Sequence, residues 1–362
     1  HDRSIYNSYF LRRANAIGVG TMRRFLPDTF TMLLVLTVLT ASFLPVQGAS
    51  AHYFGIATNF AIGLLFFLHG ARLSRDVVIA GMLHWRLHLV ILLTTFGIFP
   101  LLVLAIGHVV PESILPVSLY TGLLFLSVLP STVQSSIAFT SIAGGNVPAA
   151  ICSASASNIF GMFLTPLLVG VLFSVGGHGG GFSWDVLWQI MMQLLAPFIL
   201  GQLLQPWIGN WIRSKKKILM PVDRGSILMV VYSAFSEAVV EGLWHTFSVL
   251  DIATVIVANM VLLAMVICIT MFGSRALGFE KADEITITFC GSKKSLASGV
   301  PMANVIFAGQ SIGAIVLPLM LFHQIQLMTC AVLAQKYADA AKRREAAKIQ
   351  AGSKPSEATN AA

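Results

Sequence analysis

Two adjacent lysines lie deep within an apolar stretch of the sequence, in the run Thr288-Phe-Cys-Gly-Ser-Lys-Lys-Ser-Leu-Ala-Ser-Gly-Val-Pro301. A charge at the centre of a bilayer costs on the order of 3 kcal/mol, so such residues usually line a water-filled path or pair with an anion. The glycine, serine and proline residues around the pair weaken a helix and supply hydroxyls to freed backbone groups. We therefore predict a broken helix near residues 290–299; the alternative is a lysine pair that snorkels from a helix end. The polar side chains expected at this break are Ser292, Lys293, Lys294 and Ser295.

A second polar interruption, Leu129-Pro-Ser-Thr-Val-Gln-Ser-Ser136, falls midway through another apolar run. Its proline cannot donate a backbone hydrogen bond and disfavours a continuous helix. Most of the side chains that follow are hydroxyls, and one is an amide. We predict a second broken helix near residues 130–136. The residues expected to line a substrate or ion pathway there are Pro130, Ser131, Thr132, Gln134, Ser135 and Ser136.

The elements that must position both breaks are transmembrane helices. Of the 362 residues, 56% are hydrophobic and only 10% are charged, and the mean hydropathy is +0.81. Soluble domains are about 25% charged. Apolar runs long enough to cross a bilayer recur along the chain, without the alternation that is typical of a membrane barrel. We predict an all-α polytopic membrane protein with ten transmembrane segments, at residues 28–46, 51–71, 86–107, 114–143, 147–174, 184–208, 222–241, 246–274, 282–308 and 311–335.

The basic residues predict the orientation of these segments. With the N-terminus inside, every Lys and Arg except Lys293 and Lys294 lies in or beside a cytoplasmic segment, as the positive-inside rule expects. Both termini are therefore expected in the cytoplasm, in a bacterial inner membrane. The net charge of +8 then needs no nucleic-acid partner, because anionic lipid and the membrane potential favour basic residues on that side. The expected organisation is a cytoplasmic N-terminal segment at 1–26, five-helix repeats at 27–174 and 184–335, and a basic, largely disordered cytoplasmic tail at 336–362.

Similar sequences follow the two breaks and indicate an internal repeat. Ile142–Asn146 (IAGGN) precedes a helix that contains FLTPLL, and Ile306–Gln310 (IFAGQ) precedes one that contains IVLPLM. Two units of five helices, with the fourth and ninth helices broken, must be inverted relative to each other in the membrane. This layout is typical of secondary transporters whose broken helices cross at the midplane and form the substrate and ion site.

These motifs together resemble the bile acid:sodium symporter family, most closely the branch that includes bacterial proteins and the seventh mammalian member. The matching pieces span residues 27–335 in order. The resemblance implies a panel of helices 1, 2, 6 and 7, a core of helices 3–5 and 8–10, and an alternating-access cycle. The motifs are FFLHGARLS (66–74), HWRLHL (84–89), LPSTVQSS (129–136), GGNVPAAI (144–151), VYSAFSE (231–237) and the lysine-containing stretch with IFAGQ and LPLMLFH.

The resemblance also implies where sodium would bind in coupled members of the family. One site there uses a Ser-Asn pair after the helix-four proline, hydroxyls on helix five and a Glu on helix nine. A second site adds a Gln on helix three and another helix-nine amide. In this sequence, Ser135 and Ser136 occupy the positions of the Ser-Asn pair. Phe289 occupies the position of the Glu, and Lys293 occupies that of the helix-nine Gln. Thr95 occupies the position of the helix-three Gln. The helix-five hydroxyl positions are occupied by Ala150 and Ala154, and the polar residues close to them are Ser153, Ser155, Ser157 and Asn158.

Sodium coupling is therefore in doubt, because a hard cation prefers anionic and neutral oxygen ligands and the anionic ligand is missing. A sodium site rebuilt from Ser135, Ser136, Asn158 and Thr95 is the one metal candidate. The alternative hypothesis is that one of the two lysines replaces the bound cation at the crossing. Which of them does so stays open, as does the coupling ion: sodium, a proton or none.

Three further side chains complete the predicted pathway. Glu237 lies in an apolar segment and is a candidate partner for a lysine, or else it faces water near the outer end of its helix. His323 and Gln324 lie in the tenth segment near the break and are candidates to bind substrate or relay protons. A histidine that a neighbouring carbonyl satisfies is the alternative for His323.

The function predicted from these features is secondary active transport of a small organic anion. We expect no catalytic residues and no cofactor, since phosphate-binding loops, catalytic triads and metalloprotease motifs are missing from the sequence. The expected partners are the substrate anion and the lipid bilayer, and the substrate and the oligomeric state stay open. The alternative is a membrane ligand sensor of the same fold, without ion-coupled flux.

Overall fold

The computed structural model describes residues 29–72, 84–175, 184–240, 242, 247–308 and 310–352. Within these ranges the regular elements are helices, as expected in lipid, where each backbone group needs an internal partner. The predicted N-terminal segment, 1–26, lies outside the described residues. Six described helical stretches are long and apolar enough to cross a membrane, so the chain is a polytopic membrane protein. They are Gly48–Arg72, Trp85–Val109, Val147–Phe173, Lys217–Val240, Val249–Ala276 and Ile312–Ala341.

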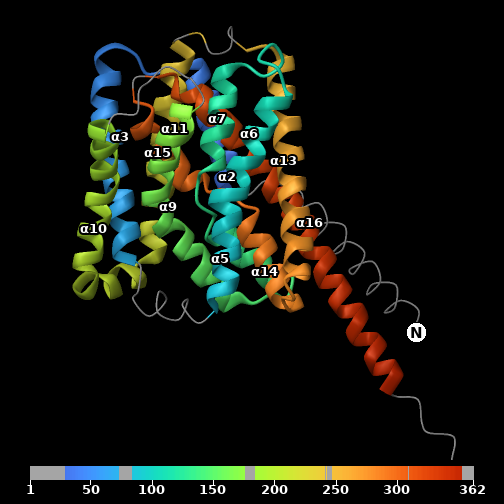
Figure 1. The fold of residues 1–362 in the computed structure, drawn as a ribbon. Helices are drawn as coiled ribbons and strands as arrows, with labels where there is room; N and C mark the ends of the chain where they lie inside the picture. Colours follow the sequence, from blue (N-terminus) through green and yellow to red (C-terminus); the bar gives the residue numbers. More distant parts are fainter. Residues whose placement is uncertain are drawn as a thin grey trace, which may run out of the picture.

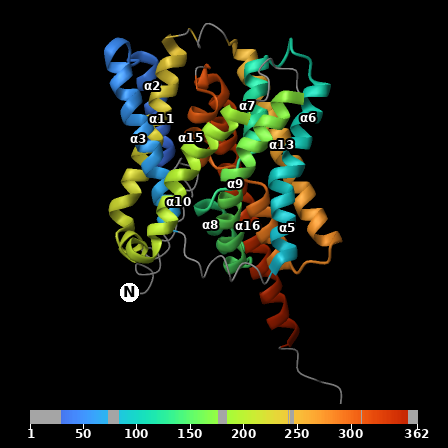
Figure 2. The same ribbon diagram turned by 60° about the vertical axis from the view of Figure 1, so that its left-hand side comes forward.

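The helices form two groups that stand side by side (Figure 2). The first group, at the left of that view, contains α2 (Thr29–Phe43), α3 (Gly48–Arg72), α10 (Trp184–Ser214) and α11 (Lys216–Val240). The second group contains α5 (Trp85–Leu93), η2 (Thr94–Ile98), α6 (Phe99–Val109), α7 (Val117–Ser127), α8 (Gln134–Ile142), α9 (Val147–Val175), α13 (Val249–Ala276), α14 (Lys281–Gly291), α15 (Leu296–Ile306) and α16 (Ile312–Gly352).

Within the first group, α3 and α10 pack closely along their lengths because glycines face the neighbouring backbone. A Cβ added at Gly70 would lie 2.1 Å from the carbonyl oxygen of Phe198, and one at Gly201 would lie 2.1 Å from that of Phe67. Only glycine allows this approach, which dispersion forces favour in lipid. The first group is therefore held together along its own helices, separately from its contacts with the second.

Two helices of the second group are interrupted. The chain leaves helix α7 at Ser127 and resumes as α8 at Gln134, where the sequence predicted an interruption near 130–136. It leaves α14 at Gly291 and resumes as α15 at Leu296, where the sequence predicted an interruption near 290–299. Pro130 lies in the first gap and the lysine pair lies in the second.

A third irregularity was not predicted. The span Trp85–Val109 is helical throughout, but its middle, η2, is a π-helical turn between α5 and α6. Such turns contain one residue more than an α-helical turn and are frequent at functional sites.

The last helix is longer than the sequence analysis expected. The tenth segment was predicted to end at residue 335 and to be followed by a largely disordered tail at 336–362. In the structure, α16 continues as helix to Gly352 and extends away from the bundle (Figure 1). The physical reason is composition, since residues 336–351 are rich in Ala, Lys and Arg, which are good helix formers. Residues 353–362 lie outside the described part of the chain.

Candidate functional site: the crossing of two broken helices

The two helix breaks contact each other directly. The backbone N–H of Ser295 donates to the carbonyl of Pro130 at 2.8 Å, and the hydroxyl of Ser131 donates to the carbonyl of Cys290 at 2.6 Å. A third bond joins the hydroxyl of Ser136 to the carbonyl of Phe289 at 3.2 Å. The non-helical backbone of each break is thus satisfied by the other, which is what allows irregular structure at membrane depth.

The remaining carbonyls of the first break also receive donors from elsewhere in the molecule. The hydroxyl of Thr165 donates to Val128 at 2.8 Å, and the side-chain amide of Asn158 donates to Ser131 at 2.8 Å. Both donors come from α9. The carbonyls of Ser127 and Leu129 are left for another donor, and that donor is a lysine.

Lys294 inserts its ammonium group into a cage of backbone carbonyls. It is 0% exposed, and its Nζ lies 2.6 Å from the carbonyl oxygen of Thr95, 2.6 Å from that of Ser127 and 2.9 Å from that of Leu129. The three acceptors match the three N–H donors of an ammonium group. The ring of Phe99 lies 4.1 Å away and adds a cation–π contact. A fixed organic cation therefore occupies the meeting point of η2, the end of α7 and the second break.

One of these carbonyls is available because of Pro100. At the end of η2, the N–H of Phe99 donates to the carbonyl of Thr94, five residues back. In the same register, the carbonyl of Thr95 would accept from residue 100, which is proline and has no N–H. The π-helical turn and the proline together leave the Thr95 carbonyl for Lys294.

Another carbonyl is available because of Pro130. Near the end of α7, the N–H of Leu129 donates to the carbonyl of Leu126, three residues back. In that register the carbonyl of Ser127 would accept from residue 130, again a proline. The next donor, the N–H of Ser131, bonds instead to the hydroxyl of Ser157 at 3.0 Å.

Lys293 is equally buried but has different surroundings. It is 0% exposed, and its Nζ has no hydrogen-bond partner among the described residues. It lies 3.8 Å from the ring centroid of Phe139 and 5.5 Å from that of Phe289. Phe289, which occupies the position of the Glu in the sodium-coupled pattern, therefore forms part of an aromatic cage around Lys293 rather than a cation site.

Gln326, on α16, holds the backbone of the second break. Its amide oxygen accepts from the N–H of Lys294 at 2.8 Å, and its amide nitrogen donates to the carbonyl of Lys294 at 2.9 Å. The same nitrogen lies 3.0 Å from Nδ1 of His323. His323 and Gln324 were predicted from the sequence as pathway residues, whereas Gln326 was not. A glutamine three residues after the selected histidine, one helical turn further along, was the available signal.

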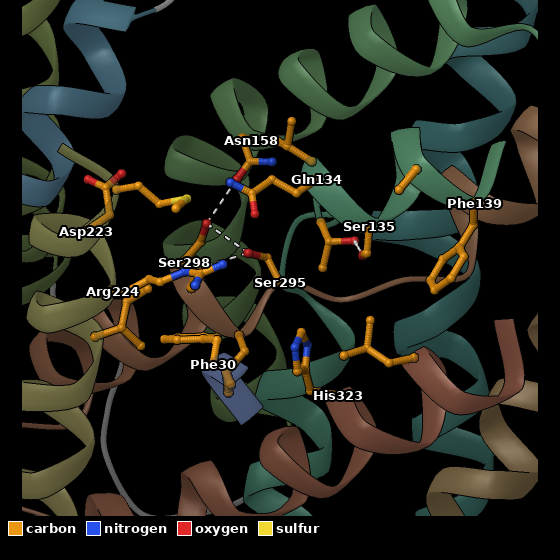
Figure 3. Close-up of a pocket in the computed structure, with 18 of the residues that line it drawn as sticks. Phe30, Gln134, Ser135, Phe139, Asn158, Asp223, Arg224, Ser295, Ser298 and His323 are labelled. Atoms are coloured by element: carbon orange, nitrogen blue, oxygen red, sulfur yellow. Dashed lines mark hydrogen bonds between the residues drawn. The ribbon is translucent and has the colours of Figure 1, made fainter. Parts of the chain in front are cut away.

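A cavity of about 700 Å³ lies beside the crossing, between the two groups of helices. Figure 3 shows Asp223 and Arg224 on its first-group side and Asn158, Ser295, Ser298 and His323 on its second-group side. Hydrogen bonds fix part of this wall: the hydroxyl of Ser298 donates to Asn158 at 2.9 Å, and the hydroxyls of Thr132 and Ser135 are 2.6 Å apart. The apolar part of the lining includes Phe30, Leu65, Phe139, Ile227, Leu327 and Val332.

The charged groups of the cavity favour a negatively charged ligand. Arg72 is paired with Asp223, while Arg224 lies 5.4 Å from the ring centroid of Phe30. The N-terminal residues of two helices, α8 and α15, also line the cavity, and helix N-termini carry partial positive charge. Arg72 and Arg224 were not predicted to line a cavity, because the positive-inside rule attributed them to cytoplasmic segments.

The predicted pathway residues fall into three sets. Those that line the cavity are Thr132, Gln134, Ser135, Asn158, Ser295, His323 and Gln324. Those buried behind it, in the crossing, are Pro130, Ser131, Ser136, Ser292, Lys293 and Lys294. Glu237 belongs to neither: it is exposed and lines a second cavity, of about 480 Å³, together with Asn59 and Asn304. The hypothesis that Glu237 pairs with a lysine is not supported by this position.

Two of the four candidate sodium ligands, Thr95 and Asn158, make hydrogen bonds within the protein. The hydroxyl of Thr95 donates to Ile91, and the carbonyl of Thr95 accepts from Lys294. Asn158 donates to Ser131 and to Ala154 and accepts from Ser298. The oxygens of Thr95 and Asn158 are thus engaged in bonds within the protein, and the Lys294 ammonium group lies at the Thr95 carbonyl.

Comparison with known proteins identifies a family of membrane transporters. A model of the SBF-like CPA transporter family matches residues 28–339. The chain is 57% identical over 333 residues to "Uncharacterized protein PA2026" of Pseudomonas aeruginosa, a match that covers 92% of this chain and 98% of that protein. It is 53% identical over 324 residues to "Putative symporter YfeH" of Escherichia coli, covering 90% of this chain and 95% of that one. Sodium/bile acid cotransporter 7 of Xenopus tropicalis is 28% identical over 324 residues, a match that covers 87% of this chain and 93% of that protein.

Proposed function

The chain belongs to the SBF-like CPA transporter family, and on that premise we propose that it is a secondary transporter that moves a small organic anion by alternating access. The observation that carries this proposal is the crossing of two broken helices beside a cavity between two groups of helices. The sequence resemblance to bile acid:sodium symporters is confirmed by the family match and by the cotransporter 7 relatives.

The finer architecture is part of the proposal. We infer ten transmembrane helices in two inverted five-helix repeats, 27–174 and 184–335, with both termini in the cytoplasm of a bacterial inner membrane. The group α2, α3, α10 and α11 corresponds to the panel, and the other helices correspond to the core. Rocking of one group against the other would expose the cavity to either side in turn.

The cavity lining supports an organic anion as substrate. Its apolar part suits a carbon skeleton, while Arg224 and the N-termini of α8 and α15 suit a carboxylate or sulfonate. Its volume, about 700 Å³, suits a molecule of drug-like size. A bile acid is a substrate named for relatives that are 28% identical, and it is one member of the class proposed here.

We also infer that this transporter does not bind sodium at the crossing. Lys294 supplies there the positive charge that a bound ion would supply, and its three carbonyl acceptors leave no room for a second cation. A tethered ammonium cannot dissociate, so the driving force must come from another ion or from the substrate gradient itself.

The test is uptake into liposomes that contain the full chain. Labelled taurocholate and a series of shorter organic anions would be offered with sodium or choline outside, and with or without a proton gradient. We expect saturable uptake of at least one anion that choline does not abolish. Arg224→Gln should raise the KM about tenfold through loss of a charged hydrogen bond. The matched control is Arg213→Gln, an exposed arginine on α10 that does not line the cavity.

Two outcomes would contradict the proposal. Strict dependence of uptake on sodium would overturn the role of Lys294. Saturable anion binding without uptake of any anion would favour the alternative, a ligand sensor of the same fold.

A further inference from the structure

The hydrogen bonds of Gln326 fix the protonation state of His323. Because the amide oxygen faces the N–H of Lys294 and the amide nitrogen faces its carbonyl, the orientation of the Gln326 amide is determined. The amide nitrogen then presents its second N–H to Nδ1 of His323, 3.0 Å away. Nδ1 must therefore accept a hydrogen bond, and the imidazole is neutral with its proton on Nε2.

Protonation of His323 conflicts with this arrangement. The imidazolium ion carries an N–H on both nitrogens, so its Nδ1–H would face an amide N–H. Rotating the Gln326 amide would remove that conflict but would place its oxygen against the Lys294 carbonyl and its nitrogen against the Lys294 N–H. Gln326 is 0% exposed, so water is not at hand to replace the lost bonds. Protonation of one side chain therefore disturbs the backbone of the second break.

His323 is placed where protons and anions can reach it. It lines the large cavity, as does Ser295 at the start of α15, and Figure 3 labels both residues. The other titratable or charged groups that line this cavity are His69 and Arg72 on α3 and Asp223 and Arg224 on α11. Behind it, the Lys294 ammonium is held by carbonyls and the Lys293 ammonium faces Phe139.

We propose that His323 is the proton-binding site of this transporter and that Gln326 is the positioning residue that transmits its protonation to the helix crossing. An anionic substrate in the cavity favours the imidazolium form, so the anion and the proton are taken up together. Protonation then weakens the two hydrogen bonds between the Gln326 amide and the Lys294 backbone, which we call the Gln326 clamp, and allows the second break to rearrange. This inference rests on the proposed function and names the coupling ion of the same site.

The experiment measures opening of the break in the full chain without any ligand. Ala297 is partly exposed in the cavity, in the first turn of α15, and Ala297→Cys introduces a thiol there. N-ethylmaleimide labelling rates would be measured between about pH 8 and about pH 5.5, which brackets ordinary imidazole titration. Each rate is divided by the rate for the same variant denatured in SDS at the same pH, which cancels the pH dependence of thiolate chemistry. The parent chain, with its four native cysteines, sets the background.

We expect the corrected rate of Ala297→Cys to rise about fivefold at the lower pH, the factor that one buried hydrogen bond supports. Adding His323→Gln should remove the pH response, because no group is left to protonate. Adding Gln326→Leu should give a high rate at every pH, because the clamp is missing although His323 is present. The matched control is His69→Gln, the other histidine of the cavity, which should keep the full response.

A pH response that survives His323→Gln, or one that His69→Gln abolishes, would overturn the proposal. Since His323 lines a cavity, its replacement by glutamine should fold, and this variant decides the result even if Gln326→Leu does not fold. The outcome is independent of flux. A protein that binds anions without transporting them would still show the response, and a sodium-coupled transporter would lack it.

Discussion

Lys293 and Lys294 are neighbours in sequence and are equally buried, yet different groups surround their ammonium groups. Lys294 receives three carbonyl acceptors from two other elements, whereas Lys293 meets the faces of Phe139 and Phe289. Successive residues of an extended segment point in opposite directions, so Lys294 faces the crossing while Lys293 faces the rings of Phe139 and Phe289. A buried positive charge is thus accommodated here in two ways, by backbone acceptors that the rest of the fold leaves free and by the faces of aromatic rings.

The largest expected effect separates the two lysines by stability. Lys294→Met should lower the free energy of unfolding by about 3 kcal/mol or more, because three buried carbonyls lose their donor at once. The matched substitution Lys293→Met should change it by no more than about 1 kcal/mol, since a thioether suits an aromatic cage and only a cation–π contact is lost. Thermal unfolding of both variants in the same detergent measures the difference. Equal destabilisation would show that the two environments are equivalent after all.

A smaller effect tests whether Pro100 is the reason that the Thr95 carbonyl is left without a backbone donor. Pro100→Ala restores an N–H that can satisfy the Thr95 carbonyl, so the same carbonyl should depend less on Lys294. In a double-mutant cycle, Pro100→Ala and Lys294→Met should couple by about 1 kcal/mol, with the proline variant reducing the cost of losing the lysine. Strict additivity of the two substitutions would mean that the proline does not determine which carbonyl is free.

The smallest expected effect is that of sodium. Replacing sodium by choline should leave the Tm of the unmodified chain unchanged within about 1 °C, because an ion that does not bind cannot stabilise the folded state by mass action. Lys293→Met should behave in the same way. Specific stabilisation by sodium over choline would indicate a rebuilt site at Ser135, Ser136 and Asn158, and it would remove the reason to assign the cation role to Lys294.

Much of the fold was predictable because bilayer physics leaves few choices. Length and hydropathy determine that the chain is a helical membrane protein, and the resemblance to bile acid:sodium symporters was readable from short motifs. Pro130 and the Gly-Ser residues before the lysines predicted interruptions where α7 and α14 end. The composition after residue 335 was judged by charge rather than by helix propensity, so the continuation of α16 to Gly352 was missed.

The functional site was predictable only in part. Hydroxyls, amides and lysines near the breaks were identified because polar residues are rare in apolar segments. Gln326 was overlooked because it resembles any polar residue near the end of a helix until its two bonds to Lys294 are known. Glu237 was weighed as a partner of the lysines, but its helix directs it to the second cavity.

The sequence by itself predicted that two positive charges lie at a helix break inside an apolar region, because glycine, serine and proline residues surround the pair. Only the tertiary structure decided which lysine places its ammonium group among three backbone carbonyls. That choice depends on the carbonyls left by Pro100 and Pro130, which are far from the lysines along the chain and meet Lys294 only when the helices cross. Hydrogen-bond acceptors on the backbone are identical in every residue, so a sequence cannot distinguish the free ones until the fold has used the rest.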